Sequence, residues 1–310
     1  MRLNRLCGFL IIVNLNSTSI VSAQDSFSQN YNGYPNQLMQ TPVVVANSYP
    51  LSAGKGMETC VIDKNNLHCW GSGSWGEFNF PSFTMPLLDV AVGANHVCAI
   101  DAKGLQCWGD NEYGETSVPD LKNPRAVVAG YHHSCALDDE GVKCWGDDVD
   151  NQLKVPKLIN PRLMTAGYYH TCALDDEAVK CWGGNGHGES KAPALKNVTH
   201  LSAGGDHSCA VADNKVVCWG DNYSGQSKVP SLTNPTKVAA GLMHTCAIHN
   251  NGEVKCWGDN YALQLDVPVL NQAVSISASS YHSCARDQYG VTCWGDQDYD
   301  RLAVPAGLQF

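Results

Sequence analysis

A pair of cysteines recurs seven times along the chain, and this repeat constrains the fold more than any other feature. Within each pair the cysteines are nine or ten positions apart, the second is followed by Trp-Gly, and successive pairs begin 37 or 38 residues apart. The first cysteines are Cys60, Cys98, Cys135, Cys172, Cys209, Cys246 and Cys284, and the second are Cys69, Cys107, Cys144, Cys181, Cys218, Cys256 and Cys293. A period of this length is typical of folds in which each repeat is one supersecondary unit.

The clearest copy of the repeat predicts a β-hairpin. If Cys135 faces Cys144, then Leu137 faces Val142, and the segment Asp138-Asp139-Glu140-Gly141 closes the hairpin. Asp at the first position and Gly at the fourth favour a type I turn. Facing residues of antiparallel strands lie within reach of a disulfide. Zinc sites prefer cysteines two to four residues apart, so the eight intervening residues favour one disulfide per hairpin over metal binding.

The N-terminus predicts export. Arg2 and Arg5 precede the mostly apolar segment Leu6 to Leu15, and Val21-Ser22-Ala23 offers small residues for cleavage, so residues 1–23 are expected to be a signal peptide. A membrane anchor or a buried first strand is the alternative, but an apolar run of about ten residues is too short to span a bilayer. Without Cys7 an even number of cysteines remains, which favours disulfides in a secreted or periplasmic protein.

Each unit continues beyond its hairpin through a turn and a Val-Pro such as Val118-Pro119 to an apolar stretch such as Ala126-Val127-Val128. We therefore expect about four short strands per unit and an all-β, seven-bladed propeller, since closing the ring protects the sheet edges. A β-solenoid is the alternative. The propeller is expected over residues 43–310, after a flexible lead-in at residues 24–42 that is rich in polar residues. One blade is expected to combine both ends of the chain.

The charge of the chain argues against one class of partner. Lys and Arg number 20 against 30 Asp and Glu, which gives a net charge of −10. Affinity for nucleic acid comes from clustered Lys and Arg, so nucleic acid is disfavoured as a partner. We expect a monomer with no membrane span and no cofactor.

The repeat resembles that of the regulator of chromosome condensation (RCC1) family, in its secreted, cysteine-containing form. The resemblance is carried by Ala129-Gly130-Tyr131-His132-His133-Ser134-Cys135-Ala136-Leu137, by Val142-Lys143-Cys144-Trp145-Gly146, and by the Val-Pro that follows such units. It implies a seven-bladed propeller similar to secreted bacterial members and to the ectodomains of crinkly-type plant receptor kinases. Nucleotide exchange on a small GTPase and chromatin binding, the family's best-known activities, do not fit an exported, acidic, disulfide-bonded chain.

Two patterns could carry metal chemistry. A histidine stands two residues before the first cysteine in six repeats, with Glu58 in its place in the first, and we expect each imidazole to bond backbone groups of its own blade. The alternative is a ring of metal-binding or catalytic histidines. Asp296, Asp298 and Asp300 resemble the start of a calcium loop but lack its glycine and its final glutamate. We expect these aspartates to be solvated turn residues, so no metal is predicted. The histidines are His96, His133, His170, His207, His244 and His282.

Aromatic residues gather in the two loops that flank each hairpin. One loop precedes the first hairpin strand and the other follows the second, so antiparallel geometry places both at one end of the hairpin and on one face of the ring. A set of aromatic residues that differs between blades is typical of a protein-binding face. The predicted face comprises Trp75, Tyr113, Tyr131, Tyr168, Tyr169, Tyr223, Tyr261, Tyr281 and Tyr299.

These patterns favour a non-enzymatic, exported scaffold that binds a protein partner through this face. The alternative from another class is a secreted hydrolase or lyase acting on cell-wall or carbohydrate substrates, which requires a cluster of perturbed carboxylates in one pocket. A structural component of the cell envelope is the third possibility. The chain has no Gly-x-Ser-x-Gly elbow and no phosphate-binding glycine loop, so catalytic residues are not predicted.

Overall fold

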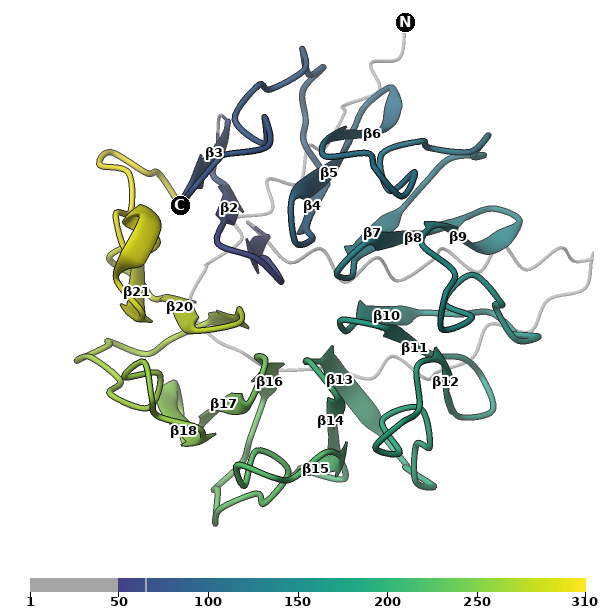
Figure 1. Cartoon of the computed structure of the whole chain (residues 1–310). Helices are drawn as coiled ribbons and strands as arrows, with labels where there is room; N and C mark the ends of the chain where they lie inside the picture. Colours follow the sequence, from purple (N-terminus) through teal and green to yellow (C-terminus); the bar gives the residue numbers. More distant parts are fainter. Residues whose placement is uncertain (1–49, 65) are drawn as a thin grey trace, which may run out of the picture. The chain divides into compact units, whose positions relative to one another are not determined.

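The computed structural model describes residues 50–64 and 66–310, which belong to one compact unit, Val44–Phe310. The expected signal peptide (residues 1–23) and lead-in (residues 24–42) lie outside the described residues. The described part forms seven antiparallel three-stranded sheets arranged around a central channel (Figure 1). We call these sheets blades 1 to 7 in chain order, and the strands of each blade inner, middle and outer.

The inner strands line the channel and contact one another in order around the ring, with β1 touching both β4 and β19. They are β1 (Leu51–Ala53), β4 (Asp89–Val92), β7 (Ala126–Ala129), β10 (Leu163–Ala166), β13 (Val198–Ala203), β16 (Lys237–Ala240) and β19 (Ser275–Ala278). The middle strands are β2 (Thr59–Ile62), β5 (His96–Asp101), β8 (His133–Asp138), β11 (His170–Leu174), β14 (His207–Ala212), β17 (His244–His249) and β20 (His282–Arg286). The outer strands are β3 (Leu67–Trp70), β6 (Gly104–Gly109), β9 (Gly141–Gly146), β12 (Val179–Gly183), β15 (Lys215–Gly220), β18 (Glu253–Gly258) and β21 (Val291–Gly295).

The middle and outer strands form the predicted hairpin with the predicted register. Cys135 faces Cys144 and Leu137 faces Val142, and a disulfide joins the facing cysteines in all seven blades. The Asp138 carboxylate accepts hydrogen bonds from the Glu140 and Gly141 amides at 2.8 and 3.1 Å, which shapes the turn. The disulfide therefore locks a register that the turn has already selected.

The expectation of four strands per unit was wrong. The stretch that contains the Val-Pro of each repeat lies beside the blade, but in the described residues it forms no strand. Proline has no N–H to donate to a ladder, and here the Val118 amide bonds the Thr116 carbonyl, 3.0 Å away, instead of a neighbouring strand. The Val118 side chain still packs into the apolar layer between blades 2 and 3.

A hydrogen-bond network joins neighbouring blades at the buried histidines. His96 of blade 2 lies 2.8 Å from the Ser134 hydroxyl of blade 3, and Ser134 donates to the Glu115 carbonyl at 3.2 Å. The indole of Trp145 donates to the same carbonyl at 2.8 Å. Since the hydroxyl donates its only proton to the carbonyl, His96 must donate from Nε2.

The same contact between histidine and a hydroxyl of the next blade recurs at six of the seven blade boundaries, at 2.7 to 2.8 Å. The expectation that each imidazole bonds backbone groups of its own blade was therefore wrong, because the partner is a Ser or Thr side chain. The exception is the boundary between blades 1 and 2, where Glu58 replaces the histidine and Val97 replaces the hydroxyl residue. The two replacements occur together, as a paired interaction requires.

Glycine makes room for each imidazole. A Cβ on Gly130 would lie 2.1 Å from Cε1 of His133, which no side chain tolerates. Glycine occupies this place in five of the six blades that carry the histidine, at Gly93, Gly130, Gly167, Gly204 and Gly241. In blade 7 Ser279 takes this place before His282, so glycine is required by the close packing in five blades but not in the sixth.

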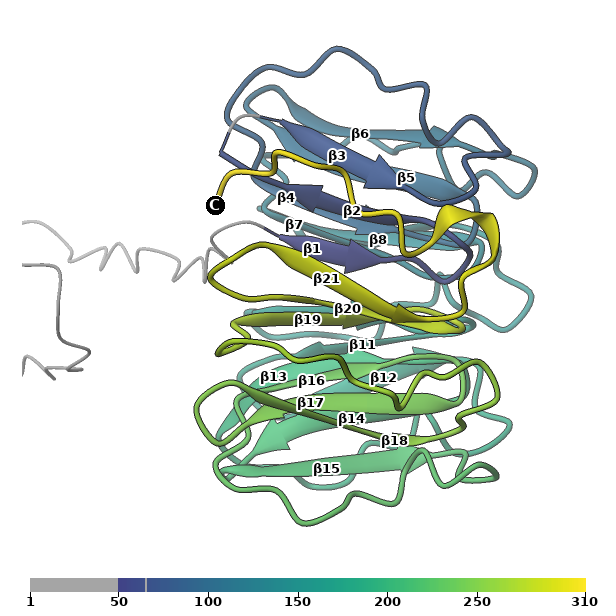
Figure 2. The same cartoon turned by 90° about the vertical axis from the view of Figure 1, so that its left-hand side faces the viewer.

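The C-terminus closes the ring against blade 1. The Trp70 indole donates to the Arg301 carbonyl at 2.9 Å, in the way that Trp145 donates to Glu115. The Lys64 amide donates to the Gln309 carbonyl at 3.0 Å, and Leu308 and Phe310 pack beside the buried Trp70. The segment after the last repeat therefore covers the blade that contains the first repeat (Figure 2).

Candidate loop-face binding site

The two loops that flank each hairpin lie side by side at one end of the blade. We call the segment between the inner and middle strands the leading loop, and the segment after the outer strand the trailing loop. In blade 3 the Asp147 amide of the trailing loop donates to the His132 carbonyl of the leading loop at 2.8 Å, and in blade 4 Gly184 donates to Tyr169 at 2.7 Å. Six of the seven blades have this bond, so these loops together form one face, which we call the loop face.

Hydrogen bonds between neighbouring leading loops make the centre of the loop face continuous. The Tyr131 amide donates to the Tyr168 carbonyl at 3.1 Å, and the Tyr168 amide donates to the Gly204 carbonyl at 3.0 Å. Ser279 of blade 7 donates its hydroxyl to the Gly56 carbonyl of blade 1 at 3.1 Å. The loops around the channel are therefore held by backbone contacts as well as by their side chains.

A buried side chain shapes each trailing loop. The Glu115 carboxylate, with no exposed surface, accepts from the Tyr113 amide at 2.9 Å, and Gln152 accepts from Asp150 at 2.8 Å. In blade 7 the corresponding residue is Arg301, which pairs with Asp296. In blades 1 to 6 a Glu or Gln thus accepts the backbone amide two residues before it, whereas Arg301 pairs with the carboxylate five residues before it.

Five rings of the loop face form one cluster on blades 2 to 4. Tyr131 stacks on Tyr168 with ring centroids 4.9 Å apart, and Tyr169 lies 6.0 Å from Tyr131 and 6.1 Å from Tyr168. His132 lies between Tyr131 and Tyr113, at centroid distances of 4.4 and 4.5 Å. We call these five residues the aromatic cluster. Sequence reasoning identified its tyrosines but not His132, whose only signal is its place beside the buried His133.

The other predicted aromatic residues do not join this cluster. Tyr281 and Tyr299 both contact Arg301, whose guanidinium carbon is 6.0 and 5.4 Å from their ring centroids. Trp75, Tyr223 and Tyr261 form no ring contact within the described residues, and the two tyrosines are more than 90% exposed. The nine residues of the predicted face therefore lie on the same face as one cluster, one pair and three separate side chains.

Tyr168 is partly a structural residue. Its hydroxyl lies against the Ser280 hydroxyl of blade 7 and donates to the Lys55 carbonyl of blade 1 at 2.9 Å. The Lys55 ammonium donates to the Ala203 carbonyl of blade 5 at 2.7 Å. Burial lowers the pKa of Lys55 to about 8. These contacts cross the ring and cover the mouth of the channel.

Carboxylates from three blades act on the aromatic cluster. Burial, followed by Tyr131 and then Asp206, Asp150 and Asp147, raises the pKa of the Tyr169 phenol. Burial and the charge of Glu189 raise the pKa of Asp206 in turn. These acidic residues come from blades 3, 4 and 5, so the fold brings together charges from three different repeats.

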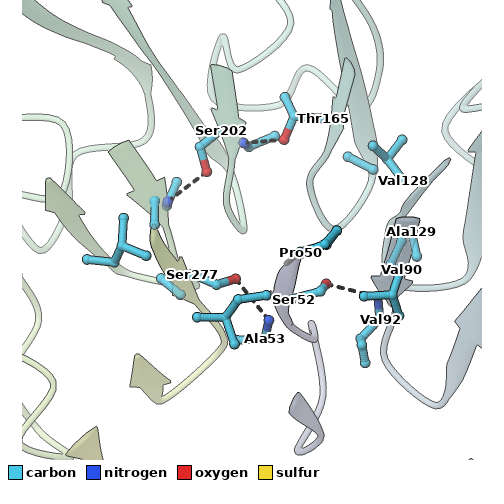
Figure 3. Close-up of a pocket in the computed structure, with 18 of the residues that line it drawn as sticks. Pro50, Ser52, Ala53, Val90, Val92, Val128, Ala129, Thr165, Ser202 and Ser277 are labelled. Atoms are coloured by element: carbon cyan, nitrogen blue, oxygen red, sulfur yellow. Dashed lines mark hydrogen bonds between the residues drawn. The ribbon is translucent and has the colours of Figure 1, made fainter. Parts of the chain in front are cut away.

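The channel below the loop face encloses a cavity of about 210 Å³ lined by the inner strands (Figure 3). Its hydroxyl groups accept backbone N–H groups of the next inner strand: Thr165 accepts from Ala203 and Ser202 from Ala240, both at 2.9 Å. Asp89 accepts from the Val127 amide at 3.1 Å, and burial raises its pKa to about 6. These polar groups are used to join blades.

The most perturbed carboxyl pair is buried in blade 1. Burial and the nearby Glu77 raise the pKa of Glu58 to about 7, and burial raises the pKa of Glu77. Both side chains are at most 2% exposed and accept amides of their own loops, Glu58 from Met57 and Glu77 from Trp75. No cavity described above reaches them, so this pair lacks the access that a catalytic pair requires.

The two sets of residues that could have bound a metal, the six histidines and the aspartates from Asp296 onward, contact other groups of the protein. The six histidines are fully buried, and burial lowers the pKa of each to about 3 or 4, so they are neutral at pH 7. Asp296 pairs with Arg301 and also accepts from the Asp298 amide at 3.0 Å, so it is not a purely solvated turn residue. Within residues 50–64 and 66–310, no group of three or more His, Cys, Asp or Glu is placed to hold a metal ion.

The geometry defines the chain as a seven-bladed β-propeller with one disulfide per blade and a continuous loop face. Comparison with known families agrees. A model described as the regulator of chromosome condensation (RCC1) repeat matches residues 88–115, 125–152, 163–189, 198–226 and 236–264. These five repeats of the chain are therefore RCC1 repeats, in a cysteine-containing form. No curated protein sequence matches it.

Solved structures with the same fold include receptor ectodomains. The entire ectodomain of the Physcomitrella patens receptor kinase CR4 is 27% identical, with a TM-score of 0.67, covering 81% of this chain and 73% of that one. The CRINKLY WD40 ectodomain of the Arabidopsis thaliana receptor kinase ACR4 is 24% identical, with a TM-score of 0.63 and coverage of 81% and 97%. Yeast RCC1 (Prp20), crystallised bound to Kap60, is 17% identical, with a TM-score of 0.67 and coverage of 94% and 89%.

Two findings bear on the compartment. Seven disulfides indicate an oxidising environment, because such bonds persist poorly in a reducing cytosol. Among the residues that the structure describes, no helix has the length and apolar character needed to cross a membrane.

Proposed function

We propose that this chain is an exported, non-enzymatic scaffold that binds a protein partner through its loop face. The observation that carries the proposal is the aromatic cluster, in which Tyr113, His132, Tyr131, Tyr168 and Tyr169 make an unbroken chain of ring contacts. Tyrosine supplies a large contact area with little loss of side-chain entropy on binding, and clusters of this kind dominate binding energy at protein interfaces.

The backbone beneath the cluster supports this role. The leading loops are joined across blade boundaries, and buried acids such as Glu115 hold the trailing loops. Side chains on a rigid support lose less freedom when a partner binds, so more of the contact energy appears as affinity. The ectodomain relatives, which belong to receptor kinases, are consistent with binding outside the cell, and the disulfides are consistent with secretion or the periplasm.

The enzyme alternative receives less support. A hydrolase or lyase needs perturbed carboxyls that a substrate can reach, whereas Glu58 and Glu77 are buried and occupied by loop amides. In the channel, the Asp89 carboxylate accepts hydrogen bonds from the backbone amides of Val90 and Val127. Glu58, Glu77 and Asp89 thus each have a structural task, and scaffolding accounts for the exposed aromatic residues that an enzyme would not require.

The test is affinity capture of a partner from the native source with the purified chain, followed by binding measurements with that partner. Tyr113→Ala combined with Tyr169→Ala should weaken binding by about tenfold or more, since residues at interface centres often contribute over 1 kcal/mol each. Tyr289→Ala is the matched control, because Tyr289 is 79% exposed but lies in the hairpin turn at the opposite end of blade 7. Equal affinity of the loop-face variant and the wild type would contradict the proposal.

A further inference from the structure

Beside the aromatic cluster the loop face carries carboxylates, which attract a positively charged group of a partner. Backbone contacts bring carboxylates to Tyr169, which is 37% exposed: the Tyr168 amide donates to the Gly204 carbonyl, two residues before Asp206, and the Asp147 amide donates to the His132 carbonyl. The charges of Asp206, Asp150 and Asp147 add to burial and Tyr131 in raising the pKa of the Tyr169 phenol. Asp206 also experiences the charge of Glu189 and Asp150. An exposed ring next to several like charges is a surface on which a cation gains from both the ring and the carboxylates.

The carboxylates lack cations of their own. Within the described residues, neither Asp150 nor Asp206 forms a salt bridge or a side-chain hydrogen bond. Burial and the charges of Glu189, Asp221 and Asp150 raise the pKa of Asp206, whereas His187, which lies 3.8 Å from Asp221, lowers it. Within the part of the chain that the structure describes, His187 therefore offsets only part of the repulsion among these acids.

The ring geometry discriminates between kinds of cation. Tyr131 and Tyr168 are stacked at 4.9 Å, which leaves no slot between them for a compact ammonium group. Tyr169 is 37% exposed and stands at 50° to Tyr131 and 76° to Tyr168. A planar guanidinium can lie flat on such a ring and still present its edge to carboxylates, whereas an ammonium is a strongly hydrated point charge.

We infer that the loop face binds an arginine side chain of the partner protein, stacked on Tyr169 and Tyr131 and paired with Asp150 and Asp206. This inference rests on the proposed function, and it names the chemistry of the partner residue at the centre of the interface. Arginine is enriched at such centres, because it combines stacking with bidentate hydrogen bonds. The acidic charge of the chain as a whole favours the approach of a basic partner.

The experiment uses the full chain with ¹³C-labelled tyrosine, observed by NMR while Nα-acetyl-arginine methylamide is added. We expect saturable shifts of the Tyr169 and Tyr131 resonances, assigned with Tyr→Phe variants. Tyr223 and Tyr261 lie on the same face outside the aromatic cluster, so their resonances are internal controls that should stay unchanged. The neutral isostere Nα-acetyl-citrulline methylamide and the lysine analogue should each bind roughly tenfold more weakly.

The variant Asp150→Asn combined with Asp206→Asn should weaken arginine binding about tenfold while leaving the melting temperature unchanged, since neither carboxylate bonds another part of the protein. Equal shifts with citrulline, equal shifts at Tyr223, or full binding by the Asn variant would each overturn the inference. Those results would not contradict the proposed function if the variant Tyr113→Ala with Tyr169→Ala still bound the partner more weakly than the wild type. Retention of the partner by that variant would remove the proposed function itself.

Discussion

His207 of blade 5 lies 2.8 Å from the Thr245 hydroxyl of blade 6, and that hydroxyl donates to the Gln226 carbonyl at 2.9 Å. The Trp257 indole donates to the same carbonyl at 2.8 Å. Three parts of the repeat that lie far apart in the chain thus meet at one boundary between blades. All are buried, so losing one partner leaves the others without a substitute from water.

Replacing Thr245 with Val should destabilise the propeller by about 1 to 3 kcal/mol, because His207 then loses its buried hydrogen-bond partner. Valine fits this place, since Val97 occupies it in blade 2 beside Glu58. The free energy of unfolding in urea measures the effect. The double replacement Glu58→His and Val97→Ser creates the missing pair, and its stability should exceed the sum expected from the single variants. Additive effects would show that the pairing does not stabilise.

Acid should destabilise the protein between about pH 6.5 and 4. In this range the unfolded chain protonates histidines that the fold keeps neutral, since burial lowers the pKa of His133 to about 4 and that of His207 to about 3. Each such group can remove up to about 1.4 kcal/mol per pH unit. Glu58 and Asp89, with raised pKa values of about 7 and 6, act in the opposite direction because the fold binds their protons first.

Six buried histidines outnumber the four carboxyls whose pKa values are raised, Glu58, Glu77, Asp89 and Asp206, so the melting temperature should fall as pH decreases from 6.5. A melting temperature that is constant or rises over this range would contradict the burial of the histidines in neutral form. Glu58→Gln should make the decline steeper, because it removes one of the opposing groups.

Ring closure should tolerate glutamine at position 301 but not alanine. Arg301 is 4% exposed and takes the place that Gln152, Gln226 and Gln264 hold in other blades. Arg301→Gln should keep the loop that offers its carbonyl to Trp70, whereas Arg301→Ala removes the side chain that shapes it. We expect Arg301→Ala to cost about 2 kcal/mol or more, with increased solvent exposure of Trp70 in its fluorescence. Equal stability of the two variants would refute this account.

Removing one disulfide should weaken the fold without changing it. For Cys135→Ser with Cys144→Ser, the chain-entropy estimate for a loop of about ten residues is about 2.7 kcal/mol. The turn at Asp138 should preserve the strand register, so the circular dichroism spectrum should match that of the wild type. A loss of the β-sheet signal at 25 °C would show that the disulfide determines the register and does not merely lock it.

The hairpin of each blade was predictable because the residues that determine its register and turn lie within one repeat. Cys135 facing Cys144 implied the register, and Asp138 and Gly141 implied the turn. The contacts between blades were not, because His96 and Ser134 meet only after the ring forms. One signal could have revealed them: the repeat that lacks histidine, at Glu58, is followed by the only repeat with valine, Val97, at the hydroxyl position.

The candidate site was predictable as a face but not as a cluster. Antiparallel geometry placed the loops at one end, but Tyr113 stands directly before its trailing-loop glycine whereas Tyr223 stands one residue earlier. The two side chains therefore point differently, and Tyr113 stacks on His132 while Tyr223 is 91% exposed. The bond from Tyr168 to Lys55 depends on blades facing each other across the channel, which no repeat pattern records.

Each disulfide of residues 50–64 and 66–310 joins a cysteine to the next cysteine along the chain, and none of these seven crosses from one blade to another. The correct partner is always the nearest one, so a chain that emerges from its N-terminus can oxidise each hairpin before the next cysteine pair appears. The pairing needs no information from the finished ring. Oxidation and ring assembly are thereby separable events, and an error in one blade does not spread through the covalent connectivity of the others.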